Sequence, residues 1–317
     1  MNQFLKGNQI KRLIGAIRHG GAAAWMGILV RMAAPITSKI AFSLPLRKSP
    51  DIHSVKGVFI FCPPRSGGTA IYQAISHALP SMPLTNGHVL FLKLGSHIYR
   101  KFKKSKNAMP AEFNNFNGYT SSLHGVNEGN EFFTWPKVNK NLEKNFLKLT
   151  ALLGPIENES IVLKNVRTYE NIASIYKACS QTGILFVRVK RNPQKIIESS
   201  LKVFRRTGVF HPIPNELQGT QIEDPVRFAV KQITLIEKVI DEQLENIPDS
   251  RKYVIAYEEF CDDPYTFIEE IALNYLGYSK SDIRHVPAIE NMHVSSKQKV
   301  PDETVERISV LLKERLK

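Results

Sequence analysis

The chain has 317 residues, of which 43% are hydrophobic and 23% are charged. That length can bury a large core, as one large α/β domain or two small ones, and the composition excludes a wholly disordered chain. The 43 Lys and Arg residues outnumber the 29 Asp and Glu residues, which gives a formal net charge of +14. Such an excess favours anionic partners, from nucleotides and acidic glycans to nucleic acid or anionic lipid, without choosing among them.

Residues 1–50 are predicted to form a basic amphipathic helical segment. Apolar and basic residues alternate there at helical spacing: Ile10, Leu13, Ile14 and Ile17 among Lys6, Lys11, Arg12 and Arg18. Such a helix lies on a membrane surface or packs on the domain. Residues 22–30 continue apolar, but charged residues and Pro35 interrupt them before the length of about 18 that spans a bilayer. We expect peripheral membrane contact, and no convincing signal-peptide cleavage site follows.

From Val58 onward, short apolar strands alternate with amphipathic helices, which is typical of a parallel sheet covered on both faces. The predicted strands are Val58–Cys62, Ile161–Leu163, Ile184–Val189 and Tyr253–Tyr257. Helices are predicted after the turn Pro63–Gly68, near Tyr169–Ser180, along Ile196–Phe204, Val226–Ile240 and Phe267–Leu276, and over Asp302–Leu316. The fold class is therefore α/β, with one domain at 51–317 and extra N-terminal helices.

Residues 95–160 do not show this alternation of strands and helices and are predicted to be an insertion. They hold many asparagines, the stretch His124–Trp135 and a basic cluster: Arg100, Lys101, Lys103, Lys104 and Lys106. Long irregular insertions in compact domains tend to be functional or mobile. The basic cluster is predicted either to grip an anionic glycan or a membrane, or to be a solvated charged loop.

Three cysteines, Cys62, Cys179 and Cys261, lie far apart in the sequence. No Cys pair or Cys/His cluster has the spacing of zinc ligands, so no metal site is predicted. Cys62 and Cys179 stand among apolar residues and are predicted to be buried thiols. Free thiols are typical of a reducing compartment, which favours a cytoplasmic location.

The segment Cys62–Thr69 lies between a predicted buried strand and a predicted helix. Its glycines let the backbone curl around an anion, and the unpaired N–H groups and dipole of the helix favour negative charge. Arg65 adds a positive charge, and Ser66 and Thr69 add hydroxyl donors. The segment is therefore a candidate phosphate site. An ATP-binding Walker loop requires a lysine before the Ser/Thr, and Gly68 stands there instead.

This loop resembles that of a known family. Pro64–Thr69 is similar to the 5′-phosphosulfate loop of sulfotransferases that use 3′-phosphoadenosine 5′-phosphosulfate (PAPS). The resemblance implies a P-loop nucleotide-kinase-like sulfotransferase fold. It also implies that PAPS is the co-substrate and that one stretch contacts its 5′ end: Arg65, Ser66, Gly67, Gly68, Thr69 and Ala70.

A second segment, Phe186–Ser199, resembles the family's 3′-phosphate element, in which an Arg ends a strand and a Ser follows eight residues later. Arg191 at a strand's carboxyl end points into the crevice where α/β proteins bind ligands, and Ser199 lies nearly two turns into the next helix. Both can reach one phosphate. A weaker match, from Tyr253 through Phe260 to Gly277, places Tyr257 near the adenine or, alternatively, in the core at a strand end.

In the reaction that this family implies, charge develops on the oxygen that bridges sulfur and the 5′-phosphate. Arg65 is the candidate that stabilises this charge electrostatically, and Lys164 is a candidate contact of the sulfuryl group. No metal is required. Cytosolic relatives use a His two residues after a Lys, but Val166 follows Lys164 at that distance here.

The general base is therefore sought in the stretch His124–Trp135, where acidic residues stand among glycines and beside aromatics, as in a sugar-binding loop. Glu128 is favoured over Glu131, and His124 is a further candidate. This pattern is closer to carbohydrate-type than to phenol-type sulfotransferases. With the membrane-prone N-terminus, it favours a glycan or glycolipid acceptor.

Two other classes of protein remain open at this point. One is a non-catalytic polyanion-binding or nucleic-acid-binding protein, favoured by the net charge but by no nucleic-acid-binding motif, so no nucleic-acid partner is expected. The other is a P-loop-like kinase, which the missing Walker lysine disfavours. The sequence does not indicate an oligomeric state.

Overall fold

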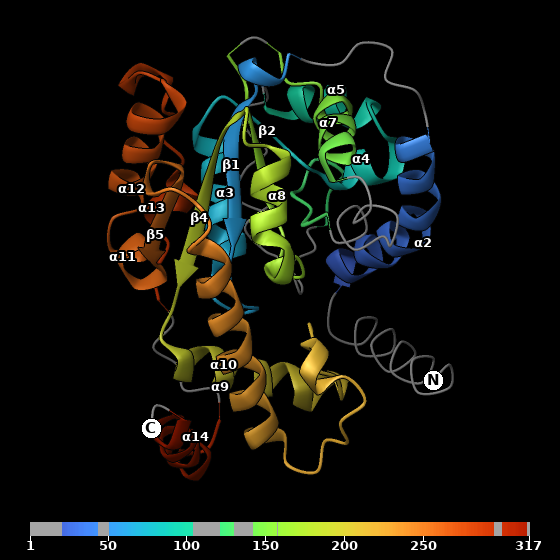
Figure 1. Cartoon of the computed structure of the whole chain (residues 1–317). Coiled ribbons are helices and arrows are strands. Elements are labelled where there is room, and N and C mark those ends of the chain that lie inside the picture. Colours follow the sequence, from blue (N-terminus) through green and yellow to red (C-terminus); the bar gives the residue numbers. More distant parts are fainter. Residues whose placement is uncertain are drawn as a thin grey trace.

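The computed structural model describes residues 21–43, 51–103, 121–129, 142–156, 158–294 and 300–315. Within them lies a five-stranded sheet in which every pairing is parallel and the strand order is β2-β3-β1-β4-β5 (Figure 1). The strands are β1 Lys56–Phe61, β2 Ser81–Pro83, β3 Ser160–Lys164, β4 Gly183–Lys190 and β5 Lys252–Ala256. The predicted α/β class with a parallel sheet is confirmed.

β1 is the central strand, and its alternating side chains contribute to both faces of the core. Val58 and Ile60 belong to one hydrophobic cluster, and Phe59 and Phe61 belong to another on the opposite face. The rings of Phe59 and Phe61 stack with centroids 4.5 Å apart, and Phe61 stacks on Phe186 of β4 at 5.4 Å. Because both faces of the sheet are buried, the strand is a continuous apolar run, and this run made the strand predictable.

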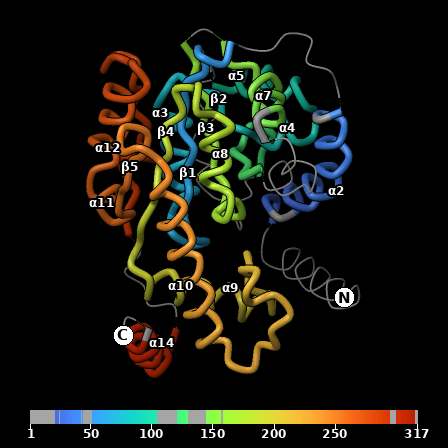
Figure 2. Tube along the Cα trace, viewed as in Figure 1, coloured from blue at the N-terminus to red at the C-terminus, as the bar shows by residue number. Residues whose placement is uncertain are grey.

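Helices cover both faces of the sheet (Figures 1 and 2). The face of Phe59 carries α4 Asn86–Phe91, α5 Leu94–Lys103, α7 Leu142–Leu153, α8 Ile172–Ala178 and α10 Pro225–Leu244, and α2 Gly21–Ser43 packs on α4 and α7. The face of Val58 carries α3 Gly68–Ala78, α11 Tyr257–Asp262, α12 Pro264–Glu270, a π-helical segment Ile271–Leu276 and α13 Pro287–Glu290. A third cluster joins α10 to α9 Pro193–Thr207 and α14 Asp302–Arg315. Short 3₁₀ turns span Ile52–Ser54, Tyr169–Asn171, Asn215–Leu217, Asp249–Arg251 and Lys280–Asp282.

The N-terminal region is described in part. The amphipathic pattern at 10–17 lies outside the described residues. The apolar run 22–30 belongs to α2, which continues past Pro35 to Ser43. Within α2, the hydroxyl of Thr37 donates to the carbonyl oxygen of Ala33 at 3.1 Å. The packing of α2 on the domain also supports the helix around the proline. No helix among the described residues is long and apolar enough to cross a membrane.

The range 95–160 also holds more regular structure than the sequence indicated. The described parts include most of α5 and all of α7, both packed on the core. Their apolar positions are interleaved with lysines and asparagines, which hid the helical period. The boundaries of the N-terminal segment, the domain and the insertion stay predictions.

Candidate functional site

The candidate site lies where four strands end. Arg65 follows β1, Lys164 ends β3, Arg191 follows β4 and Tyr257 follows β5. The carboxyl ends of parallel strands meet at one edge of the sheet, and β1 lies between β3 and β4, so the chain leaves neighbouring strands in opposite directions at this point. Such a switch point forms a crevice in open α/β sheets, and ligands bind there.

The loop between β1 and α3 is shaped by close approaches that exclude side chains. Arg65 and Gly67 both adopt positive φ angles, +69° and +86°. A Cβ atom on Gly67 would lie 2.1 Å from the ring of Tyr257. One on Gly68 would lie 2.4 Å from Sγ of Cys62. Only glycine fits at either position, and the loop can therefore turn its backbone N–H groups toward an anion at the start of α3.

Ser66 adds a hydroxyl to this loop. Its Oγ atom is buried and has no hydrogen-bond partner among the described residues. Buried hydroxyls normally have partners, because leaving one unpaired costs about 1–3 kcal/mol. The buried Oγ is therefore a donor that a phosphate or sulfuryl oxygen in the loop would fit.

The two predicted anion-binding elements meet in space. Nε of Arg65 donates a hydrogen bond to Oγ of Ser199 at 3.1 Å. Nη1 of Arg191 donates to the backbone carbonyl of Arg65 at 3.0 Å. The guanidinium of Arg191 also lies over the ring of Tyr257, 4.7 Å from its centroid, and its Nε is 3.8 Å from Glu258. The loop after β1 and the element after β4 therefore form one site.

Positive charge is concentrated around Arg65. The residue keeps solvent access, but surrounding protein atoms remove part of its hydration, and this burial lowers its pKa from the ordinary value. Glu128 raises that pKa, whereas Arg191 and Arg206 lower it. Arginine stays protonated regardless. Because these guanidinium groups repel one another, an anion bound among them would relieve the repulsion.

Glu128 lies at the other side of the loop. Its Oε1 accepts a hydrogen bond from Oγ1 of Thr69 at 3.0 Å and forms an ion pair with Nζ of Lys164. The Lys164 side chain is almost fully buried, and that of Glu128 is 11% exposed. The side-chain amide of Asn165 donates to the carbonyl of Glu128 at 3.0 Å. The predicted residues Thr69, Glu128 and Lys164 are thus in direct contact.

The segment 121–129 is fixed at this position by hydrogen bonds from the neighbouring elements. The backbone N–H of Asn127 donates to the carbonyl of Leu84 at 2.8 Å, and its side-chain amide donates to Oδ1 of Asn86 at 2.8 Å. The hydroxyl of Tyr72 donates to the carbonyl of Asn127 at 3.2 Å. Sequence reasoning missed these supporting residues. The only signal was the abundance of asparagine in the insertion.

Other predicted residues have different surroundings. The ring of His124 stacks on Phe102 of α5. Glu131 lies outside the described residues. Arg188, which lies in β4 three residues before Arg191, is fully buried and pairs with Glu237 and Asp241 of α10. No group of three or more His, Cys, Asp or Glu side chains that could hold a metal ion occurs among the described residues.

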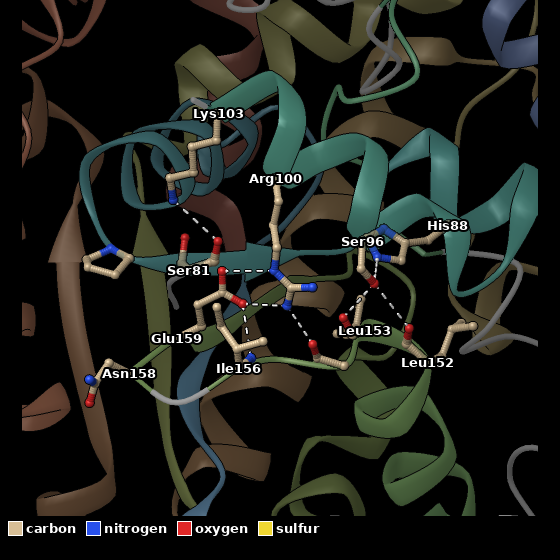
Figure 3. Close-up of polar contacts among 12 residues, drawn as sticks. Ser81, His88, Ser96, Arg100, Lys103, Leu152, Leu153, Ile156, Asn158 and Glu159 are labelled. Carbon is tan, nitrogen blue, oxygen red and sulfur yellow. Dashed lines mark hydrogen bonds and ion pairs between the residues drawn. The ribbon is translucent and has the colours of Figure 1, made fainter. Parts of the chain in front are cut away.

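Two residues of the basic cluster on α5, Arg100 and Lys103, make internal contacts (Figure 3), whereas Lys101 is exposed. Nε and Nη2 of Arg100 donate to the two carboxylate oxygens of Glu159, at 3.2 and 2.7 Å, and Nη2 also donates to the carbonyl of Gly154 at 2.6 Å. Nζ of Lys103 donates to three carbonyl oxygens: those of Ser76, Leu79 and Ser81. For these two residues both predictions, a grip on a glycan or membrane and a solvated loop, were wrong. Lys104 and Lys106 lie outside the described residues.

Comparison with known proteins agrees with this geometry. The family model described as the sulfotransferase family matches residues 57–282. The chain belongs to the sulfotransferase family, as the resemblance of its two anion-binding elements predicted, and it is an enzyme of sulfuryl transfer. A search of curated proteins found no match.

Solved structures share the fold at low sequence identity. Sulfotransferase STF9 from Mycobacterium avium is 16% identical, with a TM-score of 0.53 over 88% of this chain and 78% of that one. Sulfotransferase STF1 from Mycobacterium tuberculosis H37Rv is 15% identical, with a TM-score of 0.53 over 97% of this chain and 92% of that one. The closer resemblance to carbohydrate-type members stays a prediction.

Proposed function

We propose that this chain transfers the sulfuryl group of PAPS to a hydroxyl group of a glycan or glycolipid, with Glu128 as the general base. One observation carries the proposal. Arg65 contacts Ser199, and Arg191 contacts the backbone of Arg65, so the two anion-binding elements lie within one site. A ligand with anionic groups at two ends matches that arrangement, and PAPS is such a ligand.

The loop after β1 holds the 5′ end of the nucleotide in this proposal. The backbone N–H groups of 66–70 and the hydroxyl of Ser66 donate to phosphate and sulfuryl oxygens, and the Thr69 hydroxyl turns from Glu128 to these oxygens when the nucleotide and the acceptor bind. Arg65 adds the charge. The fit is supported by the unpaired Oγ of Ser66 and by the two glycines at which a Cβ atom would clash.

Arg191 and Ser199 hold the 3′-phosphate. A guanidinium fork and a hydroxyl on adjacent elements suit a dianionic phosphate. Tyr257 packs under both Gly67 and Arg191, so it supports the two phosphate-binding elements as well as flanking the adenosine.

Glu128, Lys164 and Arg65 perform the transfer. The acceptor hydroxyl gives its proton to the carboxylate of Glu128, its oxygen bonds to sulfur, and the bond from sulfur to the bridging oxygen breaks. The electron pair of that bond stays on the 5′-phosphate, where Arg65 and Lys164 stabilise the added charge. The hydrogen bond from the Thr69 hydroxyl to Glu128 is the kind of contact that an acceptor alcohol must make. Glu131 and His124 are the alternative bases.

The acceptor is proposed from the surroundings of Glu128. The sequence around it combines glycines, acidic residues and aromatics, which suits a sugar ring better than a small phenol. The buried thiols of Cys62 and Cys179 favour a reducing compartment, so we propose that the enzyme lies in the cytoplasm. The basic amphipathic pattern of the N-terminal sequence favours peripheral contact with a membrane.

Two measurements test this function. Calorimetry should show that adenosine 3′,5′-bisphosphate binds more tightly than ATP. A plain polyanion binder would show no such preference, and a kinase would instead turn over ATP with magnesium. Labelled PAPS, offered with glycans, glycolipids and phenols in parallel, should label a sugar hydroxyl. Label on phenols alone would overturn the proposed acceptor but not sulfuryl transfer.

A further inference from the structure

Helix α2 has an inner face that packs on the domain. Val30 and Ala34 are fully buried in the core cluster, and Met26 and Ala41 pack against it. These residues follow one another at helical spacing along the side of α2 that contacts α4 and α7. Figure 1 shows α2 at the flank of the molecule opposite α11 to α13. The inner face therefore explains why α2 is attached to the domain.

The outer face of α2 is apolar as well, and we call it the α2 stripe. It consists of five large side chains spaced three or four residues apart: Trp25, Leu29, Met32, Ile36 and Ile40. Each is between 43% and 71% exposed. Single exposed apolar residues are ordinary, but a continuous row along a helix marks an interaction surface.

The charge of the N-terminal sequence indicates the kind of partner that the α2 stripe fits. Residues 1–50 contain no Asp or Glu and eight basic residues, which account for +8 of the net +14: Lys6, Lys11, Arg12, Arg18, Arg31, Lys39, Arg47 and Lys48. Two of these, Arg31 and Lys39, belong to α2 itself. An apolar helix face flanked by lysine and arginine, without acidic residues, suits the boundary between anionic headgroups and acyl chains.

We propose that the α2 stripe docks this enzyme on the surface of an anionic phospholipid membrane. The helix lies parallel to the membrane, its five outer side chains enter the headgroup region, and the positive charge of residues 1–50 attracts the phosphates. The inner face stays on the domain, so docking requires no unfolding of α2. This inference extends the membrane contact proposed above, but it depends on neither PAPS nor the acceptor.

Sedimentation of the full chain with vesicles tests the docking. The protein should bind vesicles of equal parts phosphatidylcholine and phosphatidylserine, and bind vesicles of phosphatidylcholine alone far more weakly. The double variant Met32→Glu with Ile36→Glu should lose at least about tenfold in affinity, because two apolar side chains are replaced by charges that repel the lipid. Both side chains are exposed, so the fold should be retained, as circular dichroism can verify.

A matched control separates the α2 stripe from general surface hydrophobicity. Leu273 and Val310 are also exposed, on the π-helical segment and on α14, at 37% and 54%. The double variant Leu273→Glu with Val310→Glu adds the same charge and should bind vesicles like the unmodified chain. Equal loss in both variants would mean that net charge alone governs binding, and the role of the stripe would be rejected.

Two further results would overturn the proposal. One is unchanged vesicle binding by the Met32→Glu, Ile36→Glu variant. The other is a dimer of the unmodified chain, seen by light scattering in the absence of lipid, that this variant converts to a monomer, because the stripe would then contact a second copy. Vesicle binding is measured without PAPS, so its failure would leave sulfuryl transfer intact, and loss of sulfuryl transfer would leave docking intact.

Discussion

Two groups of basic residues lie at opposite edges of the same sheet. Arg65, Lys164 and Arg191 lie at the carboxyl edge, where β1, β3 and β4 end. Arg100 and Lys103 lie on α5, near the residues where β2 and β3 begin. In the sequence, both groups are basic residues in a chain of high net charge. In the fold, Lys164 and Arg100 each pair with a carboxylate, but the surroundings of Arg65 differ from those of Arg100 and Lys103.

The difference follows from the groups at each edge of the sheet that can contact a cation. Helix α3 points its N-terminus at the carboxyl edge and its C-terminus at the other. Lys103 donates to carbonyls at and beyond the C-terminus of α3, where the helix dipole favours a cation, and Arg100 has a full carboxylate partner in Glu159. At the N-terminus of α3, Arg65 hydrogen-bonds to a hydroxyl, and its neighbours include two other arginines as well as Glu128, which is itself paired with Lys164. Positive charge there remains available to an anion.

The largest expected effect is on turnover when Arg65 is replaced. Arg65→Ala removes the charge that we propose stabilises the bridging oxygen, and it should lower kcat by about 10³-fold, the scale of a cation that stabilises developing charge. Single-turnover assays with labelled PAPS measure this loss. Arg100→Ala serves as the matched control at the other edge, and turnover per folded molecule should be unchanged. Near-normal kcat in Arg65→Ala would remove Arg65 from the chemistry.

Glu128→Gln tests the general base. It should lower kcat by about 10²-fold, because a carboxamide cannot accept the acceptor's proton, and the affinity for adenosine 3′,5′-bisphosphate should change little. The readouts are kcat and calorimetric affinity, measured side by side. Glu131→Gln, assayed separately, distinguishes the two carboxylates. If both variants keep full activity, neither carboxylate takes part in proton transfer.

Arg191→Ala should weaken binding of adenosine 3′,5′-bisphosphate by about 1–3 kcal/mol, the range of charge-assisted hydrogen bonds. Lys101→Ala, on the exposed side of α5, should bind the nucleotide like the unmodified chain. Calorimetry compares the three proteins. Equal affinities in all three would contradict the assignment of the 3′-phosphate element.

Sequence reasoning could predict two anion-binding elements because local spacing carries that information. Strand, glycine turn and helix follow one another within a few residues around Arg65, and Arg191 and Ser199 are separated by one strand end and two helical turns. The parallel order of the strands then brings both elements to one edge. The contact between Arg65 and Ser199 itself, across more than one hundred residues, was expected only through a shared ligand.

The partners of Arg100 and Lys103 could not be predicted in the same way. Glu159 and Gly154 lie more than fifty residues from Arg100 in the sequence. The carbonyls that accept hydrogen bonds from Lys103 belong to the backbone, so no residue type in the sequence indicates them. The α2 stripe was hidden for a related reason. Pro35 and two basic residues interrupt the apolar run, and only the packed inner face shows where the outer face lies.

At the amino edge, Arg100→Ala should affect stability and not catalysis. Losing the hydrogen bonds to Glu159 and Gly154 should lower the free energy of unfolding by about 1–2 kcal/mol, because the pair is only partly buried. Urea denaturation measures this change. Weaker binding of adenosine 3′,5′-bisphosphate in folded Arg100→Ala would contradict the division between the two edges.

The smallest expected effect is the pH dependence of stability due to Lys103. Burial lowers the pKa of Lys103 to about 7, against an opposing influence of Glu159 and with a further lowering by Arg284. In the unfolded chain the ordinary value of 10.5 applies. Between these two values the unfolded chain binds the proton and the folded chain does not, so the free energy of unfolding should rise as pH increases from about 7 toward 10.5.

Lys103→Met should remove that part of the rise, because methionine does not titrate. Lys101→Met is the matched control, since Lys101 is exposed on the same helix and its substitution should leave the slope as it is. Denaturation midpoints measured across this pH range compare the three proteins. The same slope in Lys103→Met as in the unmodified chain would mean that Lys103 keeps its proton when folded. It would then be a fully charged cap on α3, and the two edges of the sheet would both hold their lysines and arginines as cations.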